Sequence, residues 1–95
     1  MSPESRPVRL SRHAHRRALD RGVEIDRVAR TISEADWQTA EGGRWKAIKC
    51  FPYGQVSPMN KRFYRFQTVE AVFVEEAAEI VIVTVKAYYS NEESV

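Results

Sequence analysis

Apolar residues recur at helical spacing in two segments near the start of the chain. The first, Arg12 to Arg21, is rich in Arg, Ala and Leu. Ser11 before it is a favourable N-cap residue, and Gly22 stands where a glycine commonly closes a helix. A second helix is predicted from about Asp26 to Ile32, because apolar residues there form one stripe: Ile25, Val28, Ala29 and Ile32.

Strand-forming residues replace this pattern after Gly43. β-Branched and aromatic side chains concentrate in three regions, Arg44 to Phe51, Phe63 to Val74 and Ile80 to Tyr89. The middle region is read as one strand or as two. The last is apolar on both faces, which predicts a central strand buried on two sides.

The connections between these strand regions differ in kind. Pro52, Gly54 and Pro58 predict a long connection after the first region. Residues Glu75 to Glu79 form a segment short enough for a hairpin loop. The fold class predicted is α+β, with two N-terminal helices packed on an antiparallel sheet of three or four strands. The expected core consists of Val81, Val83, Val85, Val28, Ile32, Ala14, Ala18 and Leu19.

The length of the chain predicts the number of domains. The chain has 95 residues, which suits one domain. We expect a flexible arm at residues 1–9, a single α+β domain at 10–89 and an acidic tail at 90–95. Apolar runs are far shorter than the roughly 20 residues that cross a bilayer, and no apolar segment follows the basic N-terminus. A cytoplasmic protein without a membrane span is expected.

Charge is divided unevenly along the chain. Residues 1–65 contain 14 Lys and Arg against 7 Asp and Glu, whereas residues 66–95 contain one Lys and 6 Glu. Charge alone favours an ordinary solvated surface, with a polyanionic partner such as RNA as the alternative. Cys50 is the single cysteine, so no internal disulfide and no paired-cysteine metal site is expected. The glycines form no nucleotide-binding loop, and no cofactor is predicted.

The first predicted helix carries a row of side chains that could take part in catalysis or phosphate binding. At 100° per residue, His13, Arg17 and Arg21 lie on one side. An imidazole can move a proton near neutral pH, and guanidinium groups match phosphate oxygens. The alternatives are a solvated helix face and a structural stripe paired with carboxylates such as those of Asp20 and Glu24. His15 lies in the apolar arc and is expected in the core or at its boundary, too far around the helix to share a metal ion with His13.

The predicted strands mix cations with aromatic residues, as single-stranded nucleic-acid surfaces do. Lys46, Lys49 and Tyr64 are candidates for binding a substrate in this mixture. Thr84, Lys86 and Tyr88 share one face of the last strand because side chains alternate along it. In the structural alternative, the aromatic rings fill the core and the cations extend into water.

The segment S-R-H-A-H-R-R-A-L-D-R-G-V-E-I-D-R-V, residues 11–28, resembles the opening of a small prokaryotic domain family. The family pattern is Ser/Thr-x-His-Ala-x-x-Arg-x-x-x-Arg-Gly-Ile/Val, and its closing strands read here as Val69 to Val74 and Ile80 to Val85. This family is grouped with the BrnT and RelE-like ribonuclease toxins. The resemblance implies a RelE/BrnT-like fold, metal-independent RNA cleavage and a cognate antitoxin as partner. Residues Phe51 to Phe66 depart from the pattern, whereas the motif positions are matched by His13, Arg17, Arg21, Gly22 and Thr84.

The leading hypothesis is a metal-independent endoribonuclease of the toxin–antitoxin type, which cleaves RNA through the substrate 2′-hydroxyl. His13 would be the general acid or base, and Arg17 and Arg21 would hold the phosphate. The alternative is a non-catalytic module that binds nucleic acid or protein. Residues expected to bind substrate are Lys46, Lys49, Tyr64, Thr84 and Tyr88.

Overall fold

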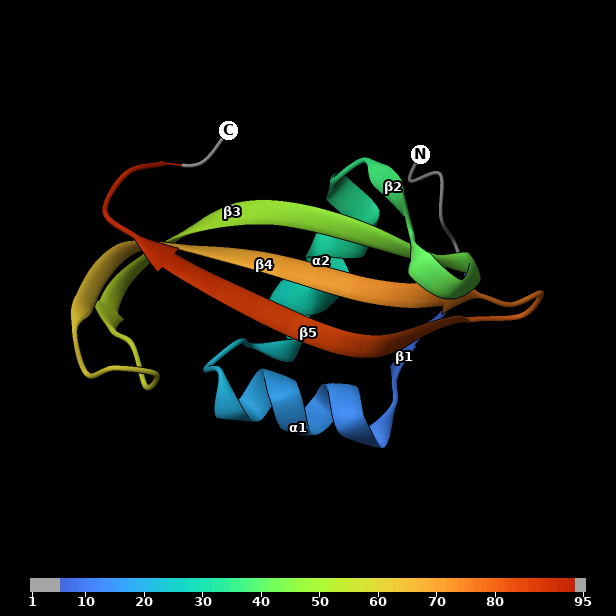
Figure 1. Cartoon of the computed structure of the whole chain (residues 1–95), viewed down its shortest axis with the longest axis horizontal. Coiled ribbons are helices and arrows are strands. Elements are labelled where there is room, and N and C mark those ends of the chain that lie inside the picture. The colour runs from blue at the N-terminus through green and yellow to red at the C-terminus, as the bar shows by residue number, and fades with distance from the viewer. Residues whose placement is uncertain (1–5, 94–95) are drawn as a thin grey trace.

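The computed structural model describes residues 6–93, and its elements follow one another in the order shown in Figure 1. The sheet and two helices make an α+β fold, as predicted. Residues 1–5 of the expected arm and 94–95 of the expected tail lie outside the described residues. The elements are β1 (Val8–Leu10), α1 (Arg12–Asp20), α2 (Ile25–Glu34), β2 (Trp37–Ala40), the 3-10 turn η1 (Glu41–Gly43), β3 (Arg44–Val56), β4 (Phe63–Glu75) and β5 (Ile80–Ser90).

The sheet has five strands in the order β1-β5-β4-β3-β2. The pairs β2–β3, β3–β4 and β4–β5 are antiparallel, whereas β1 runs parallel to β5, with Val8 opposite Ile80 and Leu10 opposite Ile82. The expectation of an antiparallel sheet of three or four strands was therefore wrong. Parallel strands need a long crossover, and here most of the chain separates the two partners. Strand β1 also begins within the segment expected to be a flexible arm.

Strand β3 is longer than predicted and continues through Pro52 and Gly54 to Val56. Strand β2 leaves β3 at Ala47, so the remainder of β3 has no strand neighbour on that side. Proline is tolerated at such an edge because its missing N–H faces away from the ladder. A register shift between Pro52 and Gln55 accommodates the extra residue. The long connection expected here was wrong, whereas the short loop between β4 and β5 is confirmed.

Both helices form close to their predicted positions, the first predicted by its capping residues and the second by its apolar stripe. The Ser11 hydroxyl accepts the Ala14 backbone N–H at 3.1 Å, and Gly22 follows α1 with a φ of 71°. Helix α2 begins one residue before Asp26, which lies in the first turn. Neither helix in residues 6–93 is long and apolar enough to cross a membrane.

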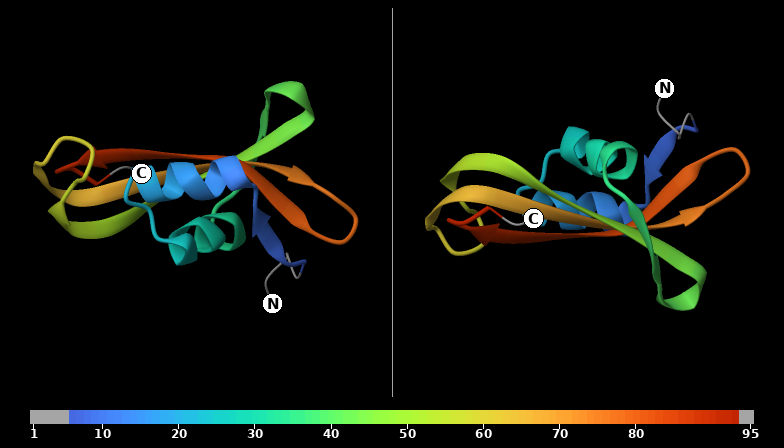
Figure 2. Two further views of the ribbon diagram at one scale, coloured as in Figure 1. Left: turned by 90° about the horizontal axis from the view of Figure 1, so that it is seen from below. Right: turned by 90° about the horizontal axis from the view of Figure 1, so that it is seen from above.

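The helices occupy different positions around the sheet. Helix α2 crosses behind the strands in Figure 1, while α1 lies along the edge beside β5 (Figures 1 and 2). Ala47, Ala71 and Val85 are opposite one another across β3, β4 and β5, and all are fully buried toward the helices. Because side chains alternate, their neighbours point to the other side, which neither helix of residues 6–93 covers. We call this side the uncovered face; the β2–β3 hairpin curls toward it in Figure 2.

The core follows from this arrangement. Six predicted core residues are confirmed as buried: Ala14, Ala18, Val28, Ile32, Val81 and Val85. Leu19 was wrongly placed there and is 65% exposed, because α1 contacts the sheet edge through only one narrow side. His15 is exposed for the same reason, contrary to the prediction. Val83 is only half-buried, because it lies at a register shift in the β4–β5 ladder.

A buried polar network holds the end of α1 on the sheet. Gln67 is 1% exposed; its amide nitrogen donates to the Gly22 carbonyl at 3.1 Å and to the Tyr89 hydroxyl at 3.0 Å. Its amide oxygen accepts from Arg27 at 3.0 Å. The Tyr89 hydroxyl in turn donates to the Arg21 carbonyl. Satisfied buried polar groups of this kind specify one arrangement, so the turn between the helices is fixed in place.

Candidate functional site

Helix α1 is attached to the edge of β5 that β1 leaves free. At its start, the Ser11 backbone N–H donates to the Ile82 carbonyl at 2.9 Å. At its end, the Arg21 guanidinium donates to the Val85 carbonyl at 2.5 Å. These bonds satisfy carbonyl groups that a further strand would otherwise pair. Arg21 therefore has a structural role and orients the rest of the predicted stripe along β5.

His13 lies between the other member of that stripe and the last strand. Its Nε2 atom is 3.4 Å from Arg17 Nε and 3.4 Å from Thr84 Oγ1. A guanidinium group can only donate hydrogen bonds, so Nε2 is the acceptor and the ring proton belongs on Nδ1. Both contacts are long, and the imidazole is exposed. The arrangement presents a basic nitrogen, a guanidinium and a hydroxyl at one accessible point.

A groove of about 680 Å³ runs over the uncovered face next to this cluster. The β2–β3 hairpin forms one wall, because it curls over the sheet (Figure 2). Arg44, Lys46 and Lys86 bring positive charge to the lining, and Glu70 lies 3.7 Å from the Lys86 ammonium. With Glu41 the lining has three cations and two carboxylates, and the cations can hold an anion. Its lining comprises Thr39, Ala40, Glu41, Arg44, Lys46, Glu70, Val72, Thr84 and Lys86.

Several residues predicted from the sequence lie together here. His13, Arg17 and Thr84 form the cluster described above, and Lys46 lines the same groove as Thr84. Tyr88 is 52% exposed and lies four residues further along β5, on the face shared with Thr84. An exposed ring on the strand face that also carries Lys86 is suited to stacking on an unpaired base.

Lys49 lies on the opposite side of the sheet. Its ammonium is 3.4 Å from Glu34 at the end of α2 and 5.7 Å from the centre of the buried Phe51 ring. The hydrogen bond from Arg30 lowers the pKa of Glu34, with Lys49 adding to the effect. Lys49 therefore serves to hold α2 on the sheet, away from the groove.

Tyr64 is also separate from the groove. Its hydroxyl accepts from Asn60 at 2.7 Å, and its ring centre is 5.6 Å from that of Tyr89. The centre of the Tyr53 ring is 5.1 Å from that of Tyr89, and partial burial raises the Tyr53 pKa. These tyrosines pack the far end of the β3–β4 hairpin.

Sequence reasoning missed Glu70 and the hairpin wall. Glu70 lies beside Lys86 because the β4–β5 register places the two residues opposite each other. That register depends on a shift at Val72 and cannot be read from local pattern. The alternative in which carboxylates pair with Arg17 and Arg21 is not observed: within the described part of the chain, neither guanidinium forms an ion pair. Residues 6–93 contain no group of three His, Cys, Asp or Glu side chains suited to a metal ion.

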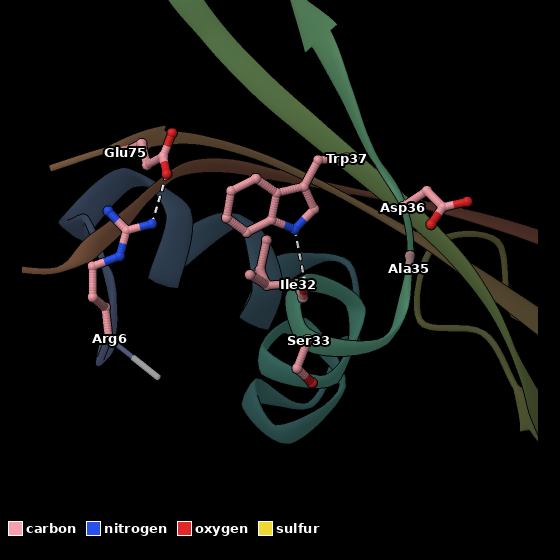
Figure 3. Close-up of a pocket in the computed structure, with 7 residues that line it drawn as sticks. All are labelled: Arg6, Ile32, Ser33, Ala35, Asp36, Trp37 and Glu75. Carbon is pink, nitrogen blue, oxygen red and sulfur yellow. Dashed lines mark hydrogen bonds and ion pairs between the residues drawn. The ribbon is translucent and has the colours of Figure 1, made fainter. Parts of the chain in front are cut away.

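A second pocket, of about 380 Å³, lies between the end of α2 and the start of the sheet (Figure 3). Its Trp37, Arg6 and Glu75 side chains already have hydrogen-bond partners. The Trp37 indole donates to the Ile32 carbonyl at 2.9 Å, and Arg6 pairs with Glu75 at 2.6 Å. The Asp36 carboxylate points away from the indole in Figure 3. We interpret this pocket as structural and the groove as the candidate site.

Comparison of the chain with protein-family models, with curated proteins and with solved structures finds no match.

Proposed function

We propose that the protein is a metal-independent endoribonuclease that binds RNA in the groove on its uncovered face. The observation that carries this proposal is the position of His13 Nε2, 3.4 Å from both Arg17 and Thr84 at the side of a basic groove. A neutral imidazole with an accepting Nε2 can remove a proton, and the neighbouring donors can bind phosphate oxygens. The RNA substrate supplies its own nucleophile, so no metal is needed.

The reaction follows from these roles. His13 Nε2 accepts the proton of a 2′-hydroxyl, and the 2′-oxygen bonds to the adjacent phosphorus. The bond from phosphorus to the 5′-oxygen breaks, and water protonates that leaving oxygen. The resulting hydroxide takes the proton from the imidazolium, and the products are a 2′,3′-cyclic phosphate and a 5′-hydroxyl. Arg17 and Thr84 donate to the phosphate oxygens, on which negative charge grows in the transition state.

Residues near the His13 cluster bind the RNA strand. Lys46 and Lys86 attract phosphates along the groove, and Tyr88 stacks on a base beyond it. Arg21 is assigned a positioning role instead of phosphate contact, because its guanidinium is bound to the β5 backbone. Lys49 and Tyr64 take no part in this proposal, since they lie outside the groove. A cognate antitoxin, implied by the family resemblance, remains the expected protein partner.

The experiment compares two histidines of the same helix. His13→Ala and His15→Ala are assayed on fluorescent RNA oligonucleotides in EDTA, with circular-dichroism melts to check folding. A general base contributes about 10² to 10⁴ in rate, so His13→Ala should lose this factor while His15→Ala cleaves like wild type. A 2′-O-methyl oligonucleotide should bind without being cut.

Two outcomes would contradict the proposal. One is a wild-type protein that binds the 2′-O-methyl oligonucleotide but leaves RNA intact; this outcome favours the non-catalytic nucleic-acid-binding module. The other is a His13→Ala variant that cleaves as fast as wild type, which would place the catalytic base elsewhere.

A further inference from the structure

The outer side of α1 carries a second, chemically different surface. Arg12, His15, Arg16 and Leu19 follow the spacing i, i+3, i+4, i+7, which places them on one side of a helix. They line a groove of about 710 Å³ together with Leu10 of β1 and Asp20. We call this groove the α1 groove. It faces away from Ala14 and Ala18, which are fully buried against the sheet.

The α1 groove combines an apolar centre with positive charge. Leu19 is 65% exposed, the largest exposure among the large hydrophobic residues of the described chain, and Leu10 is half-buried beside it. Within residues 6–93, neither Arg12 nor Arg16 forms an ion pair. Asp20 is the only carboxylate that lines the groove. An apolar side chain flanked by unpaired cations fits a ligand that is both apolar and acidic.

The charge and the side-chain types of the α1 groove indicate which class of ligand it can bind. A symmetric contact with a second copy would place Arg12 and Arg16 against the same residues, and this like-charge contact is unfavourable. RNA is disfavoured because the lining has no Phe, Tyr or Trp ring on which bases stack. A protein segment can supply aliphatic and carboxylate side chains at helical spacing.

We propose that the α1 groove docks an acidic amphipathic segment of a protein partner. An aliphatic side chain of that segment packs on Leu19 and Leu10, and its carboxylates pair with Arg12 and Arg16. His13 and Arg17 lie on another side of the same helix, so this docking does not require them. The inference therefore goes beyond the proposed nuclease and stands or falls separately from it.

The test uses two synthetic peptides of about 14 residues, long enough for helix to form on binding. The probe has leucines at i, i+4 and i+7 flanked by glutamates; the matched control has lysine in place of every glutamate. Each is titrated into ¹⁵N-labelled full-length protein and followed by NMR. The acidic probe should shift the amides of Leu10 and residues 12–20, and the lysine peptide should not.

Variants then assign the contacts. Arg12→Glu with Arg16→Glu should weaken the acidic probe at least tenfold, because two attractive pairs become repulsive. Leu19→Ser should weaken it about fivefold, since half of a leucine side chain is no longer buried by the peptide. Phe63→Ser is the matched control, because Phe63 is 57% exposed at the far hairpin and should not affect binding. Circular-dichroism melts verify folding, and Leu19→Ala replaces Leu19→Ser if the serine variant is unstable.

The proposal is overturned if the acidic probe produces no shifts up to millimolar concentration, or if it shifts residues of the uncovered face instead. Equal binding of both peptides would also overturn it, because charge would then play no part. RNA cleavage by the Leu19→Ser variant should equal that of wild type. A protein that lacks cleavage but binds the probe at the α1 groove would leave this inference intact while refuting the nuclease.

Discussion

Gly22 allows a sharp test of how α1 is fixed, because two separate effects act at this position. Its φ of +71° is in the left-handed region, where a side chain costs about 1–2 kcal/mol. A Cβ atom there would also stand 2.6 Å from Pro58 Cγ and 2.9 Å from Pro58 Cδ. Overpacking of this kind costs about 1–3 kcal/mol. Gly22→Ala should therefore lower the free energy of unfolding by about 2–5 kcal/mol.

Gly54 is the matched control. Its φ is +64°, yet nothing lies within 4 Å of the position of its Cβ. Gly54→Ala should therefore lose only the backbone contribution, about 1–2 kcal/mol. Urea denaturation measures both values under the same conditions. Adding Pro58→Ala should recover the packing contribution in the Gly22→Ala background and leave the Gly54→Ala background unchanged.

Equal losses for Gly22→Ala and Gly54→Ala would refute the reasoning, because the Pro58 contact would then contribute nothing. So would a Gly22→Ala, Pro58→Ala double variant no more stable than the sum of the two single losses predicts. Either result would mean that Pro58 does not pack closely enough on Gly22 to exclude an added Cβ atom.

Three further predictions concern charge, pH and the core. When the logarithm of the binding constant for single-stranded RNA is plotted against the logarithm of salt concentration, Lys46→Ala should reduce the magnitude of the slope by about 0.7. Lys49→Ala, on the other side of the sheet, should not change the slope. Equal effects of the two variants would contradict the assignment of the groove as the RNA-binding site. The Arg9 guanidinium hydrogen-bonds Glu79 and holds the pKa of that carboxyl below its ordinary 4.5, so the stability from this pair is present above pH 4.5 and is lost as pH falls through the lowered value. In Arg9→Gln, a carboxyl-carbon NMR titration should find the Glu79 pKa raised toward 4.5, and an unchanged titration would count against the pair. Val85→Asp should prevent folding, since an unpaired buried carboxylate costs several kcal/mol against a total stability of about 5–15 kcal/mol. The half-buried Val83 should tolerate aspartate better. Circular-dichroism melts compare the two variants, and a folded Val85→Asp protein would be evidence against this core.

The sequence predicts those parts of the fold that depend on local signals. Helix α1 was recognised because Ser11 and Gly22 are strong capping residues, and the β4–β5 hairpin because two apolar runs flank a short polar loop. Strand β1 carries no such signal: it has three residues with Arg9 at its centre, and its partner strand begins at Ile80. Strand β2 is also short, with only four residues.

In the candidate site, too, local sequence pattern predicts some of the arrangement and not the rest. The helical period alone places His13 beside Arg17, and the strand period places Thr84 and Tyr88 on one face. That His13 meets Thr84 depends on α1 lying along the edge of β5, which no local pattern specifies. The same placement explains why Leu19 is exposed, since a helix at a sheet edge buries a narrower side than a helix on a sheet face. Lys46 and Lys49 are three residues apart in β3, so the strand period places them on opposite faces, and only the position of α2 shows which of the two faces is covered.

Because β1 pairs with β5, the candidate site can assemble only late in the synthesis of the chain. His13 and Thr84 are 71 residues apart in the chain. At about 5–20 residues per second, the ribosome adds Thr84 roughly 4 to 14 s after His13. Until then β1 has no neighbour, and a nine-residue helix such as α1 is marginal by itself. A growing or truncated chain that ends before β5 thus carries the imidazole and both arginines without an assembled site, and the proposed activity begins only once β5 has been added.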